Sequence, residues 1–147
     1  KIPHAGTYIN TEERDKKYPL LLEKNGFRIA LLNYTYGTNG IPVTPPNIVN
    51  YIDTTVIAKD IEESKTMKPD AIIACMHWGI EYQSLPSKKQ KFLADWLLQK
   101  GVDHVIGSHP HVVQPIEVRE DSLTKEKHLV VYSLGNYISN MSARPPH

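Results

Sequence analysis

The sequence predicts an α/β fold in which a mixed β-sheet is layered with α-helices. Three observations support this prediction. A turn pair joins two apolar runs early in the chain, two capped helical patterns are each followed by a short apolar run, and further strand-like runs close the sequence. The order of hairpin, helix, strand, helix and strand, followed by a meander of the last strands, indicates a mixed sheet and excludes an all-β or all-α protein.

The first two strands are predicted on either side of Asn25-Gly26. This dipeptide separates the apolar runs 18–24 and 27–34, and Asn-Gly between such runs is the strongest short signal for a β-hairpin. The segment 37–46 then contains two glycines and three prolines, which exclude a helix interior and a central strand. We expect a loop there.

Two helices follow from capping signals. Asp53 is expected to cap a helix that runs to about Met67, where the coming Pro69 forbids continuation. The run from Ser87 to Gln90 has the form of a capping box, and the helix it opens should end at Gly101.

Four later strands complete the predicted sheet. The run 70–76 is continuously apolar, as in strands that are buried on both faces. Shorter runs are predicted as strands at 104–106, 112–118 and 128–133. The last two are expected to pair across the charged segment 119–127.

Length and charge limit the function classes. The chain has 147 residues, which fits one domain. Its 17 basic and 16 acidic residues are scattered along the sequence, so no field strong enough to hold a nucleic acid is expected. Every apolar run is far shorter than the roughly 20 residues that cross a bilayer. The single Cys75 excludes a disulfide within the chain.

Three histidines stand where predicted strands end. His77 directly follows the run 70–76, and His109 and His111 follow the strand 104–106. Ligands of open sheets gather at such carboxyl ends, and neutral imidazole is the commonest metal ligand. The alternatives are surface histidines in a Gly-Pro turn and, for His77, a ring held by a hydrogen bond at a strand end.

Three motifs occur in order, namely His77-Trp-Gly-Ile-Glu-Tyr82, Gly107-Ser-His-Pro-His-Val-Val-Gln-Pro-Ile-Glu117 and Tyr132-Ser-Leu-Gly-Asn-Tyr137. Together they strongly resemble the CapA family of poly-γ-glutamate capsule proteins, which belongs to the calcineurin-like metallophosphatase superfamily. The resemblance implies the C-terminal half of a four-layer α/β/β/α sandwich. It implies a single truncated domain over 1–147, with 18–139 as the core and 1–17 and 140–147 as peripheral segments.

The same resemblance implies a two-metal centre. His77 and His109 would share one divalent ion, and His111 would bind the other, with Mn, Fe and Zn all compatible. The superfamily's aspartate and asparagine-histidine motifs do not occur in the sequence. We therefore expect a chain that begins downstream of the first half of the domain, an incomplete site and an inactive fragment. Glu81 and Asn136 are candidate catalytic or supporting residues, and a solvated loop position is the alternative for Glu81.

For the intact protein, the resemblance implies capsule polymer biosynthesis by metal-dependent hydrolase chemistry. It places that protein outside the cytoplasm at the bacterial cell surface, where a membrane anchor could hold it, with an anionic polymer or its precursor as partner. Two alternatives remain open. One is a metal-free module that binds or scaffolds the polymer, and the other is a half-domain that self-associates through an open sheet edge.

Overall fold

A computed structural model describes residues 2–136 and confirms the mixed α/β fold. A six-stranded sheet has the order β2-β3-β5-β6-β8-β7, and a separate two-stranded ribbon joins β1 to β4. The strands are β1 (Thr7–Tyr8), β2 (Leu20–Lys24), β3 (Phe27–Thr35), β4 (Ile48–Val49), β5 (Ala71–His77), β6 (His104–Ser108), β7 (Ile116–Glu120) and β8 (Lys127–Val131), and the helices are α1 (Thr11–Lys17), α2 (Thr54–Thr66) and α3 (Lys88–Lys100).

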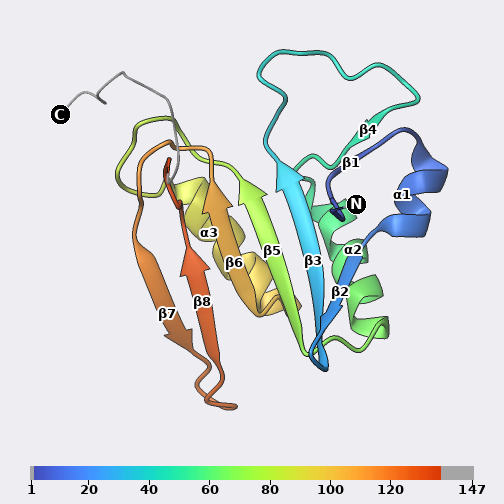
Figure 1. Ribbon diagram of the computed structural model, residues 1–147. Coiled ribbons are helices and arrows are strands. Elements are labelled where there is room, and N and C mark those ends of the chain that lie inside the picture. Colours follow the sequence, from blue (N-terminus) through green and yellow to red (C-terminus); the bar gives the residue numbers. More distant parts are fainter. Residues whose placement is uncertain (1, 137–147) are drawn as a thin grey trace.

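The four inner strands run parallel to one another. Strands β3, β5, β6 and β8 all point toward the same edge of the sheet, while β2 and β7 lie antiparallel at the two ends (Figure 1). The hairpin at Asn25-Gly26 is confirmed, as is the pairing of the last two strands. The predicted meander is wrong in one respect, because β6 pairs in parallel with β8 and not with β7. The carboxyl ends of four neighbouring strands therefore meet along one rim, which we call the carboxyl rim.

Capping residues define the ends of the two long helices, α2 and α3, close to where the sequence predicts them. The Asp53 side chain accepts hydrogen bonds from two backbone N–H groups of the first turn of α2. At α3, Ser87 and Gln90 form the reciprocal capping box, and Gly101 ends the helix at φ 100°. A left-handed backbone at this position costs glycine little, because it has no Cβ.

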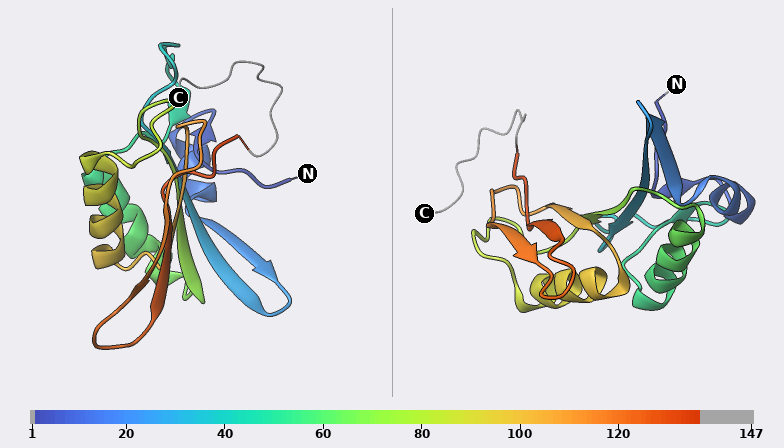
Figure 2. Two further views of the ribbon diagram at one scale, coloured as in Figure 1. Left: turned by 90° about the vertical axis from the view of Figure 1, so that its left-hand side faces the viewer. Right: turned by 90° about the horizontal axis from the view of Figure 1, so that it is seen from below.

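Both long helices pack on the same face of the sheet (Figure 2). Alternate residues of the inner strands point into this layer and are fully buried, together with apolar residues of α2 and α3: Leu32, Ala74, Val105, Val130, Ile57, Ile61 and Leu97. The residues between them, such as Leu31, Ile73 and Ile106, face the opposite side and are half-buried. This two-layer unit is consistent with an α/β fragment of a metallophosphatase-like fold.

The structure corrects the predicted strand 112–118. Strand β7 begins at Ile116, and Val113 forms only an isolated bridge with Leu134. Pro115 has no N–H to donate to a ladder, and the buried Gln114 side chain instead binds Gln90 and loop carbonyls. A polar anchor therefore replaces the first half of the strand.

The segment 1–17, treated as peripheral in the sequence, carries β1 and α1 and places Tyr8 in the core. The segment 140–147 lies outside the described residues. Within residues 2–136, no helix has both the length and the apolar character needed to cross a membrane.

Candidate metal centre

Four neighbouring strands deliver side chains to the carboxyl rim. Tyr36 follows β3, His77 ends β5, and His109 and His111 follow β6, while Asn136 comes after β8. Because these strands are parallel neighbours, residues distant in sequence arrive side by side. The structure thus brings the three predicted histidines together.

The histidine rings form a contiguous group. The ring centroids of His77 and His109 are 4.7 Å apart, and those of His109 and His111 are 5.9 Å apart. Glu81, in the loop after β5, joins them: ligand atoms of Glu81, His109 and His111 all lie within 4.8 Å of one another. We call Glu81, His77, His109 and His111 the rim cluster.

The loops that carry the rim cluster adopt an uncommon backbone. His109 has φ 100°, and His111 and Tyr82 both have φ 62°. Non-glycine residues rarely occupy this region, and such positions gather at functional sites. The Tyr82 N–H donates to the Pro110 carbonyl at 2.7 Å, so the two loops are tied together at the point where both are strained.

The backbones at Gly107 and Tyr132 approach closely beneath the rim cluster, and this contact holds its loops in place. Trp78, directly after His77, is buried and donates its indole N–H to the Tyr132 carbonyl at 2.9 Å. Gly107 allows this contact, because a Cβ there would lie 2.0 Å from the Tyr132 oxygen and 2.6 Å from the Trp78 ring nitrogen. The strands β5, β6 and β8 are thereby locked together just below the histidines.

The proton states suit metal binding. Loss of hydration lowers the pKa of His77 below its ordinary value, and the nearby His109 and His111 lower it further. Loss of hydration also lowers the pKa of His109, which outweighs the opposite effect of Glu81. Both rings are therefore neutral at pH 7 and have a lone pair to offer, as a metal ligand must.

The donor set fits a first-row divalent ion. Three imidazoles and one carboxylate offer nitrogen and oxygen ligands, a mixture that Mn, Fe and Zn accept. Glu81, considered above as a catalytic or supporting residue, lies where it can ligate directly. The assignment of His77 and His109 to one ion and His111 to another remains a prediction.

Sequence reasoning missed two residues of the site. Tyr36 stacks on His77 at 5.8 Å and contacts His109 at 4.5 Å between ring centroids. Ser108 lies 3.4 Å from the Nδ1 atom of His77. Both residues stand at strand ends, so the rule that found His77 could have found them.

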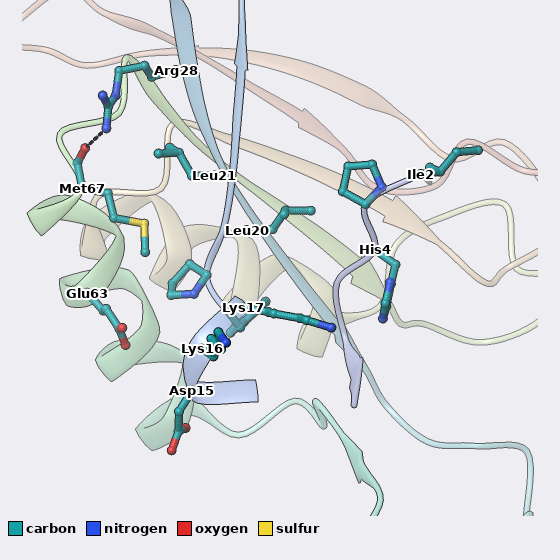
Figure 3. A pocket seen from close by; sticks show the side chains of 13 residues that line it. Ile2, His4, Asp15, Lys16, Lys17, Leu20, Leu21, Arg28, Glu63 and Met67 are labelled. Atoms are coloured by element: carbon teal, nitrogen blue, oxygen red, sulfur yellow. Dashed lines mark hydrogen bonds between the residues drawn. The ribbon is translucent and has the colours of Figure 1, made fainter. Parts of the chain in front are cut away.

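Two pockets differ in their relation to the cluster. A pocket of about 420 Å³ adjoins it and includes His77 and Ser108. A larger one, of about 660 Å³, lies between α1, β2 and the end of α2 (Figure 3). Lys16 and Glu63 line this second pocket, and none of the rim cluster does. Size alone therefore does not locate the chemistry.

Comparisons with known proteins agree with the motifs. Residues 1–141 match the family described as "Bacterial capsule synthesis protein PGA_cap". The "Capsule biosynthesis protein CapA" of Bacillus anthracis is 31% identical over 140 residues, which cover 89% of this chain and 32% of that relative. The "PGA biosynthesis protein CapA" of Bacillus subtilis (strain 168) is 32% identical over 127 residues, which cover 84% of this chain and 32% of that relative.

The chain thus spans about a third of the length of these curated relatives. The family match extends over nearly all of it and includes the motifs that build the rim cluster. This chain belongs to the PGA_cap family of bacterial capsule synthesis proteins.

Proposed function

We propose that this chain supplies the histidine side of a divalent-metal centre, which the intact protein uses for hydrolase-type chemistry in capsule polymer synthesis. The observation that carries the proposal is the convergence of His109, His111 and Glu81 within 4.8 Å, with His77 against His109. The family and its relatives support capsule synthesis as the process. That process would place the intact protein outside the cytoplasm at the cell surface.

The charge of the carboxyl rim suggests that a metal ion, and not a lysine or arginine side chain, would bind an anionic ligand there. The described rim segments 35–53, 77–87, 108–115 and 132–136 contain no lysine or arginine. An anionic polymer or precursor that approached this part of the chain would find no cationic side chain in these segments. A metal ion at the rim cluster would then be the main positive charge available to it.

The residues of this chain have separable tasks in that chemistry. A bound divalent ion supplies Lewis acidity, which activates water and stabilises charge on a phosphoryl or acyl oxygen. The imidazoles of His77, His109 and His111 would provide nitrogen lone pairs, and the Glu81 carboxylate would provide negative charge. Tyr36 packs against His77 and His109 and limits how far their rings can turn.

The first test is metal binding by the chain itself. Zn²⁺ and Mn²⁺ are titrated against the chain with a competing chromophoric chelator. We expect saturable binding that the double change His109→Ala and His111→Ala weakens at least about 100-fold, since two ligands are lost. His4→Ala is the matched control, because His4 lies outside the cluster and stacks on Tyr8.

The second test uses the full-length protein and a capsule polymer precursor. Removal of metal by a chelator should abolish turnover, and the His109→Ala and His111→Ala variant should stay inactive when metal is returned. Unchanged activity in both cases would reject the metal proposal and favour a metal-free module that binds or scaffolds the polymer.

Self-association through a sheet edge stays a separate prediction. The edge strands are β2 and β7, and either could pair with another chain. Light scattering of the chain at several concentrations tests this prediction independently of the metal.

A further inference from the structure

We propose that Asn136 is a positioning residue, which holds the neutral His111 ring with its proton on Nδ1 and so leaves Nε2 to face the metal. The inference rests on the proposed function for the metal, but the proton position can be tested without one. The observation is a pair of contacts on opposite sides of one ring. His111 Nδ1 lies 3.0 Å from Asn136 Oδ1, and His111 Nε2 lies 3.9 Å from Glu81 Oε1.

The backbone around Asn136 is fastened to the loop that carries His111. The Gln114 N–H donates to the Ser133 carbonyl, and the Leu134 N–H donates to the Gly107 carbonyl. Gly135 approaches this loop so closely that a Cβ there would lie 2.8 Å from the Val113 nitrogen. Asn136 therefore meets His111 from a fixed position, although its side chain is exposed.

The distance on the Nε2 side fits a shared ion better than a hydrogen bond. A separation of 3.9 Å is too long for a hydrogen bond between Nε2 and the Glu81 carboxylate. Two ligand atoms at about 2.0–2.1 Å from a tetrahedral ion lie about 3.4 Å apart. A movement of roughly half an ångström would bring Glu81 and His111 onto one ion.

The amide of Asn136 decides which nitrogen is available. When its carbonyl oxygen faces Nδ1, as in the structure, the ring must carry its proton there to donate. If the amide were turned and its NH₂ group donated, the proton would move to Nε2 and block the lone pair beside Glu81. Only the first arrangement leaves Nε2 free to bind an ion beside Glu81.

A second histidine of the rim cluster shows the same pattern. His77 Nδ1 lies 3.4 Å from the Ser108 hydroxyl, and Ser108 is its direct neighbour on β6. Both rings are thus approached through Nδ1 by a side chain of an adjoining strand or loop. Such outer partners of ligating histidines typically change metal affinity by 10–100-fold when they are removed.

The test reads the proton position directly, by ¹⁵N NMR of the histidine rings in the metal-free chain. It is run at about pH 8, above the usual histidine pKa of roughly 6.5, so that the rings are neutral. We expect the Nδ1–H form for His111 in the wild type and in Asn136→Asp, which keeps an acceptor oxygen. Asn136→Ala should show both forms. Asn47→Ala is the matched control, since Asn47 bonds to the Thr44 carbonyl and lies outside the cluster.

A Zn²⁺ titration of the same variants tests whether the proton position on His111 determines metal affinity. Asn136→Ala should weaken binding by about 10–100-fold, and Asn136→Asp should restore it. A wild-type His111 with its proton on Nε2 would overturn the proposal, as would an Asn136→Ala variant with full metal affinity. A wild type with Nδ1–H but no affinity for metal would support the positioning role and overturn the proposed function instead.

Discussion

Two polar clusters in this chain differ in how completely their groups are paired. Between α1 and α2, Arg14 donates to Asn50 and to the Asp60 carboxylate, each at 2.8 Å, and Tyr34 donates to the Asp60 carboxylate at 2.7 Å. We call these four residues the Arg14 cluster. At the rim, the His109 ring makes no hydrogen bond among residues 2–136. A fully paired buried cluster holds the fold together, whereas lone pairs left without donors are available to a ligand.

The pKa shifts in the two clusters show the same contrast. Burial would lower the pKa of Arg14, but the Asp60 carboxylate more than compensates and raises it, so the guanidinium stays charged. Burial also raises the pKa of Tyr34, which keeps its proton for Asp60. In the Arg14 cluster the Asp60 carboxylate accepts from both the charged Arg14 guanidinium and the Tyr34 hydroxyl, whereas burial lowers the pKa of His77 and His109 at the rim and favours their neutral form.

The largest expected effect concerns the support beneath the rim cluster. Gly107→Ala would place a Cβ 2.0 Å from the backbone oxygen of Tyr132, and no flexible side chain can move aside to relieve that clash. We expect the free energy of unfolding to fall by at least about 4 kcal/mol, in the range that marks severe overpacking. Urea unfolding followed by tryptophan fluorescence measures it.

The matched control for this change is Gly37→Ala. Apart from Gly37 itself and its two chain neighbours, no residue in the described part of the chain has a heavy atom within 4 Å of a Cβ built there, so the change should alter stability by no more than about 0.5 kcal/mol. If both variants unfold at the same urea concentration, the close approach of β5, β6 and β8 below the histidines does not exist as described.

The second-largest expected effect is a loss of stability in the Arg14 cluster that leaves metal binding at the rim cluster unchanged. Asp60→Asn keeps the shape of the side chain but leaves the Arg14 guanidinium without its counter-charge. The Arg14 and Asp60 side chains are only 16% and 5% exposed. Breaking a buried pair on one side costs about 3–5 kcal/mol, and we expect the low end because Arg14 keeps some contact with water. Zn²⁺ affinity, measured below the unfolding transition, should not change.

Asp53→Asn provides a control for Asp60→Asn on the same helix. Asp53 caps α2, and asparagine caps helices about as well as aspartate. The unfolding midpoint of the Asp53→Asn variant should therefore match that of the wild type. An Asp60→Asn variant as stable as Asp53→Asn would mean that the Arg14 cluster does not stabilise the fold.

Local signals were enough to predict most of the fold. The hairpin depends on Asn25-Gly26 and α3 on Ser87 and Gly101, and each signal lies within a few residues of what it specifies. Helix α1 was missed because it buries no residue, so it has no apolar periodicity to detect. The Asn10 cap, which accepts from the Glu13 N–H, was the available signal.

The site could be predicted only in part, for a physical reason. A strand end can be read from the sequence, and that rule located His77, His109 and His111. The approach of Glu81 to His109 and His111 depends on how two loops meet, through the positive φ of Tyr82 and its hydrogen bond to Pro110. No local pattern reports a contact between two loops.

The smallest predicted effect tests that loop contact. Glu81→Gln keeps the size of the side chain and removes its negative charge, and an amide oxygen is a poorer ligand for a transition metal than a carboxylate. We expect Zn²⁺ affinity to fall about tenfold, or about 1.4 kcal/mol, with no change in the free energy of unfolding, because Glu81 is exposed. Isothermal titration calorimetry and urea unfolding measure the two quantities on the same samples.

Glu120→Gln shows whether such a loss is specific. Glu120 is the last residue of β7, which ends at the end of the sheet opposite the carboxyl rim (Figure 1). There it lies 3.6 Å from Lys125. Removing this charge should leave Zn²⁺ affinity unchanged, because an exposed charge so far from the ion is screened by salt. Equal losses in the two variants would mean that Glu81 acts only through the net charge of the protein. A loss confined to Glu81→Gln would place a carboxylate ligand beside the histidines and complete the contrast with the Arg14 cluster, where the carboxylate has only protein partners.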